Sequence, residues 1–131
     1  MSDLTEMQAA IGRVQLRKVR EWVGIRRRNA AALHAALAGV PGIRVAQPAG
    51  GAFHSYYKFY VTVDLEKLKP GWTLLRVLES IGAEGVPCLQ GSCSEIYREK
   101  AFLDAGLGPV APLPVARRLS DTSLMFLVHP T

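Results

Sequence analysis

One helical pattern occupies the first third of the chain and most limits what this chain can fold into. TEMQ, from Thr5 to Gln8, has the form of a capping box. In this motif the side chain of the first residue binds the backbone amide of the fourth, and the side chain of the fourth binds the backbone amide of the first. Apolar residues then recur at helical spacing to about Leu37, and GVPG ends the helix. The apolar arc consists of Leu4, Met7, Ile11, Val14, Leu16, Val19, Trp22, Val23, Leu33 and Leu37. Because the helix is apolar over more than half its circumference, we expect an unusually large exposed apolar surface for a monomer.

The opposite arc of this helix is basic, and two glycines interrupt the helix. Gly12 and Gly24 each weaken a helix by about 1 kcal/mol relative to alanine, which predicts a bend or close packing at these positions. The basic arc holds Arg13, Arg17, Arg20, Arg27 and Arg28. Such an arc can contact phosphates, but a solvated helix face is the commoner explanation, because aromatic residues are not interleaved with it.

Short strands and helices alternate over the rest of the chain. Strands are predicted at IRVAQ (43–47), HSYYKFYVTVD (54–64), VPCLQ (86–90) and LMFLV (124–128), and helices at WTLLRVLESIG (72–82), SEIYREKAFLDAG (94–106) and LPVARRLSDTS (113–123). On the second strand, Tyr57, Phe59, Val61 and Val63 share one face, and we expect Tyr57 in the core. The order of elements predicts one α+β domain, a two-layer sandwich with a mainly antiparallel sheet, over residues 1–131.

Composition limits the class of protein. With 49% hydrophobic and 21% charged residues, the chain is globular, and its 131 residues suit one domain. Its apolar runs are shorter than the roughly 18 residues that cross a bilayer, and MSDLTEMQ lacks the pattern of a secretory signal. We therefore expect a cytoplasmic protein without a membrane partner. The net charge of +5 suits an anionic partner but does not identify one.

Both cysteines lie in CLQGSCSEIY, from Cys88 to Tyr97, and their spacing leaves several functions open. Zinc needs about four ligands, whereas His34, His54 and His129 are scattered singly, so no metal site is predicted. A disulfide fits a loop but not a reducing compartment, and a nucleophilic Cys93 would need a helix N-terminus or a base beside it. The leading interpretation is that Cys88 packs in a strand and Cys93 in a loop.

Complete catalytic motifs are missing from the sequence. GLGP (106–109) has only two glycines of a dinucleotide fingerprint, and G-x-S-x-G does not occur. His54, Tyr56 and Tyr57 could line a site. No catalytic residue is predicted from these patterns alone.

The order of segments resembles a known family. LTEMQAAIGRVQLRKV, RRRNAAALHAAL, GIRV, HSYYKFYV, GVPC and LPVARRLSDTSLMFLVHPT resemble, in this order, the C-terminal part of the nucleotide-sugar aminotransferases of the DegT/StrS type. The resemblance implies the small C-terminal domain of the aspartate-aminotransferase fold, in a homodimeric enzyme that uses pyridoxal phosphate. It also implies transfer of an amino group, commonly from glutamate, to a nucleotide-linked keto sugar for surface polysaccharides.

The resemblance implies as well that the cofactor-binding domain lies outside this sequence. None of Lys18, Lys58, Lys67, Lys69 and Lys100 stands where the family has its catalytic lysine, so we expect a fragment that is inactive and binds no cofactor alone. The segment after GVPC reaches the sugar in relatives. We therefore predict substrate contacts from Gly91, Ser92, Ser94 and Glu95, and from Tyr57. The alternative is a free-standing basic module that binds nucleic acid or another polyanion through the Arg13–Arg28 face.

Overall fold

The computed structural model describes residues 5–91, 95–109 and 111–130. The helices are α1 (Glu6–Leu37), α2 (Leu74–Ala83), α3 (Lys100–Asp104) and α4 (Pro114–Thr122), with 3₁₀ turns η1 (Leu65–Lys67) and η2 (Ile96–Arg98). The strands are β1 (Ile43–Val45), β2 (Phe59–Val63), β3 (Cys88–Gln90) and β4 (Ser123–Phe126). The predicted order of elements is confirmed, with shorter strands than the sequence pattern indicated.

The four strands form one antiparallel sheet in the order β1-β2-β4-β3. Phe59 of β2 is paired with Phe126 of β4, and Thr62 is paired with Ser123. The closing strand β4 therefore lies inside the sheet, between β2 and β3, although it comes last in the sequence. All four of its residues are buried, as expected for a strand with neighbours on both sides.

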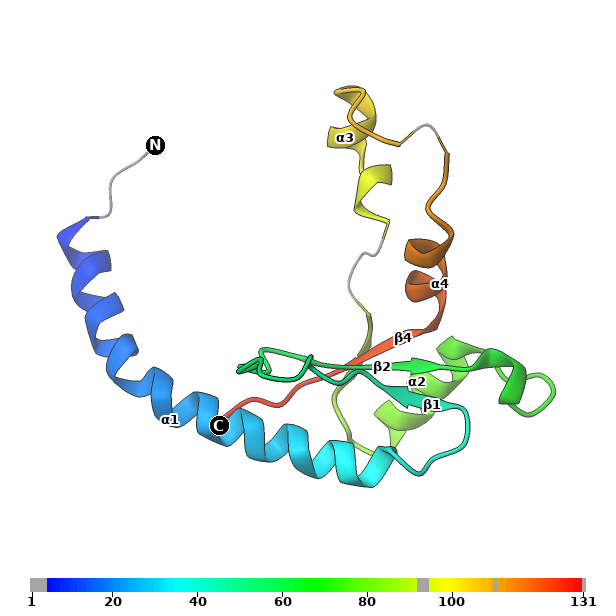
Figure 1. The fold of residues 1–131 in the computed structure, drawn as a ribbon, viewed down its shortest axis with the longest axis horizontal. Coiled ribbons are helices and arrows are strands. Elements are labelled where there is room, and N and C mark those ends of the chain that lie inside the picture. Colours follow the sequence, from blue (N-terminus) through cyan, green and yellow to red (C-terminus); the bar gives the residue numbers. More distant parts are fainter. Residues whose placement is uncertain (1–4, 92–94, 110, 131) are drawn as a thin grey trace.

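The core lies between one face of the sheet and two helices. Phe59, Val61 and Val63 alternate along β2 and are each 2% exposed, which follows the two-residue period of a strand. They pack with Ala30, Leu33 and Leu37 of α1 and Leu74, Val77, Leu78 and Ile81 of α2. Figure 1 shows the C-terminal half of α1 running beside the sheet, with α2 next to it. The predicted α+β fold with two layers and an antiparallel sheet is confirmed.

Helix α1 begins at the predicted capping box. Thr5 N donates to Gln8 Oε1 at 2.9 Å, and Gln8 N donates to Thr5 Oγ1 at 3.3 Å. The helix is curved, and its N-terminal half extends away from the sheet (Figure 1). The bend agrees with the prediction made for Gly12 and Gly24. Close packing is not found at Gly12, because a Cβ there would meet nothing within 4 Å.

The prediction that Tyr57 packs in the core is wrong. Its side chain is 71% exposed, and β2 begins only at Phe59. Tyr56 has φ of 48°, outside the extended range, so the strand alternation does not continue backward past Phe59. The backbone turn sends Tyr57 to the surface.

A long connection between β3 and α4 contains η2 and α3 and projects away from the sheet (Figure 1). Pro114 opens α4 in the first helical turn, where the missing N–H of proline costs no hydrogen bond. In the described ranges, no helix is long and apolar enough to cross a membrane.

Candidate functional site

Gly91 lies where the segment after β3 leaves the sheet. Its N–H donates to Ser123 O at 2.8 Å, and a Cβ built on Gly91 would lie 2.4 Å from Ser123 Cβ. Gln90 Nε2 adds a second link to the C-terminal part of α4, donating to Ser120 O at 3.3 Å. A glycine is needed at this position for the close approach of the two segments. Whether Gly91 also contacts a substrate stays a prediction.

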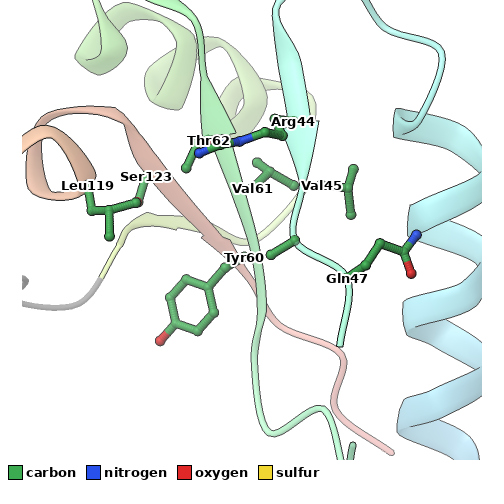
Figure 2. Close-up of a pocket in the computed structure, with 9 residues that line it drawn as sticks. Arg44, Val45, Gln47, Tyr60, Val61, Thr62, Leu119 and Ser123 are labelled. Carbon is green, nitrogen blue, oxygen red and sulfur yellow. The ribbon is translucent and has the colours of Figure 1, made fainter. Parts of the chain in front are cut away.

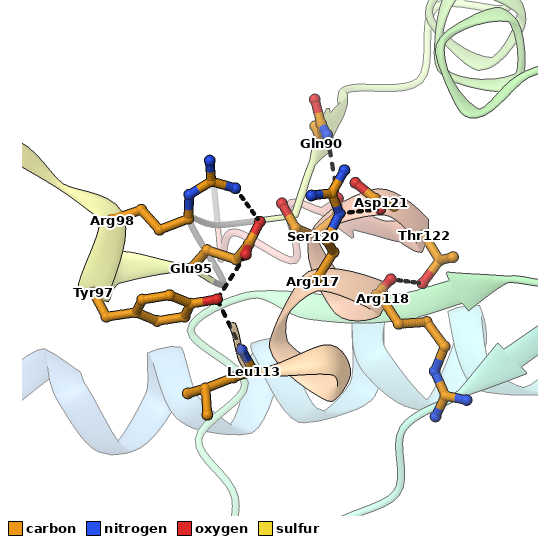
Figure 3. Close-up of polar contacts among 10 residues, drawn as sticks. All are labelled: Gln90, Glu95, Tyr97, Arg98, Leu113, Arg117, Arg118, Ser120, Asp121 and Thr122. Atoms are coloured by element: carbon orange, nitrogen blue, oxygen red, sulfur yellow. Dashed lines mark hydrogen bonds and ion pairs between the residues drawn. The ribbon is translucent and has the colours of Figure 1, made fainter. Parts of the chain in front are cut away.

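Glu95 belongs to a hydrogen-bonded network on the projecting connection (Figure 3). Its side chain is 15% exposed and forms an ion pair with Arg98 at 3.6 Å. The Tyr97 hydroxyl donates to Glu95 Oε1 at 2.7 Å and accepts from Leu113 N at 3.1 Å. The Tyr97 hydroxyl thus links Glu95, a predicted substrate residue, to Leu113, which precedes α4. Ser92, Ser94 and Cys93 lie outside the described residues.

Tyr57 lies at the opposite end of the sheet from Gly91. Gly91 binds Ser123, which is paired with Thr62 near the end of β2, whereas Tyr57 precedes the start of β2 at Phe59. The predicted substrate residues that the structure describes therefore form two separate groups, one with Gly91 and Glu95 and one with Tyr57. Sequence spacing could not reveal this, because the register of β2 with β4 decides it.

Basic side chains contact the aromatic residues of the segment that precedes β2. The guanidinium of Arg26 and the ammonium of Lys58 each lie 5.7 Å from the centroid of its ring. Arg27 lies 4.2 Å over the ring of Phe53 and donates to His54 O at 2.9 Å. Helical spacing places Arg27 on the basic arc but does not predict that Arg26 and Arg27 meet this loop.

Cys88 packs as the sequence suggested, at the edge of the core. Its thiol is free, and burial raises the pKa of Cys88 above the usual value, opposed only in part by backbone hydrogen bonds with Met125 and Leu89. A nucleophilic cysteine needs a lowered pKa, so this environment disfavours the thiolate.

Each of the three histidines makes a local contact, and the three do not cluster. His34 contacts the Gln47 side chain, and His54 Nδ1 accepts from Tyr56 N at 3.0 Å. The backbone carbonyl of His129 accepts from Asn29 Nδ2 at 3.1 Å. Within the part of the chain that the structure describes, no group of three or more His, Cys, Asp or Glu residues could hold a metal ion.

A groove of about 510 Å³ lies on the face of the sheet away from α1 and α2 (Figure 2). Arg44, Tyr60 and Thr62 alternate with the core residues of their strands and line this groove, together with Leu119 and Ser123. Arg44 Nε donates to Thr62 Oγ1 at 3.2 Å, so part of the polar lining is already paired. The polar positions of the strand alternation indicate the open face of the sheet, but no sequence pattern predicts this groove.

Four of the five lysines lie in surroundings that do not suit the anchor of an aldehyde cofactor. A lysine that forms a Schiff base is activated by desolvation or by a neighbouring cation. Lys67 is instead paired with Asp64 at 3.6 Å and Lys100 with Asp104, while Lys18 and Lys58 lie beside aromatic rings. Lys69 is exposed. Lys58 is half-buried and belongs to none of the ion pairs of the described residues, so the absence of a covalent attachment for such a cofactor stays a prediction.

The fold and the sites describe an α+β domain with separated polar surfaces and no complete catalytic set among the described residues. The family model for the DegT/DnrJ/EryC1/StrS aminotransferase family matches residues 2–131, and the chain belongs to this family.

Solved structures agree with this assignment. An aminotransferase from Psychrobacter cryohalolentis is 41% identical, with a TM-score of 0.85 over 97% of this chain and 34% of its own. DesV from S. venezuelae, in complex with a ketimine intermediate, is 26% identical, with a TM-score of 0.79 over 97% of this chain and 32% of its own. DesI, determined in the presence of its TDP-sugar product, is 29% identical, with a TM-score of 0.74 over 95% of this chain and 30% of its own. A search of curated proteins gave no match. The chain spans about a third of the length of the structures that it matches.

Proposed function

We propose that this chain is the smaller domain of a pyridoxal-phosphate-dependent aminotransferase that aminates a nucleotide-linked keto sugar. The match of the family to residues 2–131 is the observation that carries the proposal. The coverage supports a domain role, because the chain corresponds to about a third of each similar enzyme. The TDP-sugar product of DesI supports the substrate class. Membership in an aminotransferase family gives the alternative, a polyanion-binding module, no support.

The finer parts of the proposal follow the family resemblance. The domain is the C-terminal small domain of an aspartate-aminotransferase fold in a homodimer, glutamate is the amino donor, and the product enters a surface polysaccharide. The cofactor, when bound by the rest of the enzyme, supplies the electron sink for amino transfer.

In this chain, the segment from Gly91 to Glu95 and the Tyr57 side chain hold the sugar nucleotide. The Tyr97 hydroxyl and Arg98 hold the Glu95 carboxylate, which restricts its rotation before a substrate arrives. A carboxylate oriented in this way can accept from sugar hydroxyl groups through its remaining lone pairs. Binding and orientation of the sugar are therefore the tasks that we assign to this domain.

A labelling experiment tests the proposal. The isolated chain is incubated with pyridoxal phosphate, reduced with borohydride, and mapped by mass spectrometry, beside a longer enzyme that carries this domain. We expect stoichiometric labelling and amino transfer for the longer enzyme, and neither for the chain. Lys67 and Lys100 are paired with carboxylates, Lys18 and Lys69 are exposed, and Lys58 lies beside the Tyr57 ring. Stoichiometric labelling of one lysine in the chain would contradict the domain assignment.

Steady-state kinetics on the longer enzyme test the substrate residues. Glu95→Ala should raise KM for the sugar nucleotide with little change in kcat, because a lost ground-state contact weakens uniform binding. The expected loss is about 1.5–3 kcal/mol, the range for a hydrogen bond to a charged group. Arg13→Gln on the exposed half of α1 serves as the control. An unchanged KM in Glu95→Ala would exclude Glu95 from sugar binding.

A further inference from the structure

Two basic side chains flank the ring of Tyr57 at the end of the sheet where β2 begins. The Arg26 guanidinium and the Lys58 ammonium each lie 5.7 Å from its centroid, and the Tyr57 side chain is 71% exposed. Among the ion pairs of the described residues, none includes Arg26 or Lys58. Positive charge around this accessible ring is therefore not neutralised by carboxylates of the described chain.

Arg26 differs from the neighbouring Arg27 in the use of its donors. Arg27 donates to His54 O and lies over the Phe53 ring, so it connects α1 to the loop that precedes β2. Arg26 Nε is buried and has no hydrogen-bond partner. Buried polar groups are nearly always paired, and an exception calls for a specific explanation. An acceptor atom on a ligand would provide one.

The loop that carries Tyr57 is held in a strained shape. Tyr56 has φ of 48°, a conformation that costs free energy in residues other than glycine. Its N–H donates to His54 Nδ1, and the two rings meet edge to face with centroids 4.4 Å apart. Strained residues persist where the surrounding structure fixes them, and they cluster at ligand sites. Here the strained turn places Tyr57 beside Arg26.

We propose that Arg26, Tyr57 and Lys58 form a binding site for an oxyanion group of a ligand, a phosphate or a carboxylate. The planar guanidinium can bind two oxygens at once, and the lysine adds a second charge. Tyr57 is 71% exposed, so this side of the site is accessible from solvent. The site deepens the proposed function and rests on it only for the natural ligand, since nucleotide sugars carry phosphates and amino donors carry carboxylates.

Titrations of the chain by nuclear magnetic resonance test the site at fixed ionic strength, because free charges are screened by salt. The probes are pyrophosphate and glutarate, which distinguish phosphate from carboxylate. The Arg26 Nε–Hε signal reports directly on the unpaired donor. We expect a saturable shift of this signal and of the Tyr57 ring signals with at least one probe.

Substitutions separate a built site from general attraction. Arg26→Gln and Lys58→Gln should each weaken binding about tenfold or more, the loss expected for one charge-assisted hydrogen bond. Arg13→Gln removes the same charge from an exposed position on α1 and should change binding less than twofold, well below the tenfold loss. The Arg27 Nε–Hε signal shows whether the loop remains folded in each variant. If Arg26→Gln disrupts the loop, Lys58→Gln decides the question.

Equal weakening by Arg13→Gln and by the two site variants would show attraction to net charge alone and would overturn the proposal. A failure of both probes to give a saturable shift would overturn it too. The titration uses free anions and needs no amino transfer. Its failure would leave the proposed function standing, and an inactive longer enzyme would not alter its result.

Discussion

At Gly91, the chain after β3 passes so close to β4 that a side chain has no room. The virtual Cβ lies 2.4 Å from Ser123 Cβ and 3.3 Å from Ser123 O. Ser123 is itself 8% exposed and hydrogen-bonded to Gly91 through its carbonyl, so it cannot easily move. One residue thus sets how the predicted substrate segment leaves the sheet.

Gly91→Ala should lower the free energy of unfolding by about 1–3 kcal/mol, the usual cost of forcing atoms into a packed site. Denaturant titration measures the change. Gly12→Ala is the matched control, because a Cβ there meets nothing within 4 Å and alanine favours a helix by up to about 1 kcal/mol. A Gly91→Ala chain as stable as the wild type would show that the close approach relaxes at no cost.

Cys88 should react slowly in the folded chain. Burial raises its pKa, so at a given pH less thiolate is present than in an unfolded chain. Alkylation by iodoacetamide at pH 8, mapped by mass spectrometry, should be slower for Cys88 in buffer than in urea. Equal rates would contradict the burial of the thiol.

The same pKa shift affects stability at high pH. A pKa that is raised on folding gives stability that is fully present below the unfolded pKa of about 8.5 and is lost as the pH rises through the folded pKa. The free energy of unfolding should therefore fall above about pH 8.5 in the wild type. Cys88→Ala should show a smaller decrease.

At the scale of elements, the Tyr97 hydroxyl joins the projecting connection to the N-cap of α4. Leu113 is the N-cap of α4 but provides no side-chain cap, and its own N–H is bound by Tyr97. Tyr97 also donates to Glu95, so its hydroxyl couples the two ends of the connection. Arg98 adds only a partly exposed ion pair at 3.6 Å.

Tyr97→Phe removes this hydroxyl and should weaken the connection by about 0.5–3 kcal/mol, because the Glu95 and Leu113 groups lose a partner. Amide hydrogen exchange should show faster exchange at Leu113. Exchange in β2 and β4 should be unchanged, since both strands lie in the core away from this contact. Unchanged exchange at Leu113 would show that another acceptor replaces the hydroxyl.

At the scale of the whole molecule, the N-terminal half of α1 has an apolar face without a partner in the described chain. Met7, Ile11 and Val14 lie one turn apart on one face and are 75%, 55% and 49% exposed. Figure 1 shows this half extending away from the sheet. The C-terminal half of the same helix, by contrast, packs on the core through Ala30 and Leu33. Only half of the helix is used by this domain.

The exposed face should make the chain self-associate. Large apolar patches usually mark interfaces, so sedimentation velocity should show concentration-dependent dimers or larger species, with binding of an apolar dye. Ile11→Gln should reduce both signals. Arg17→Gln, on the basic arc, is the control and should leave them unchanged. A monomer at all concentrations, without dye binding, would show that the apolar face does not drive self-association in solution.

Much of the fold could be predicted because local sequence patterns reflect interactions between residues that are close together in the chain. The capping box at Thr5 and Gln8 depends on residues three apart, and the buried alternation of Phe59, Val61 and Val63 depends on the two-residue period of a strand. The order of elements then gave the fold class, and the resemblance of whole segments gave the family. These properties belong to the sequence, because neighbours along the chain are enough to define them.

Only the tertiary structure decided which residues meet. Tyr97 and Leu113 are 16 residues apart, Arg27 and His54 are 27 apart, and Gln90 and Ser120 are 30 apart, yet each pair shares a hydrogen bond. The antiparallel register between β2 and β4 separates Tyr57 from Gly91, and the turn at Tyr56 exposes a ring that the strand pattern predicts to be buried. Contacts of this kind depend on how distant segments pack, and a local pattern holds no information about the position of a partner that arrives from elsewhere in the chain.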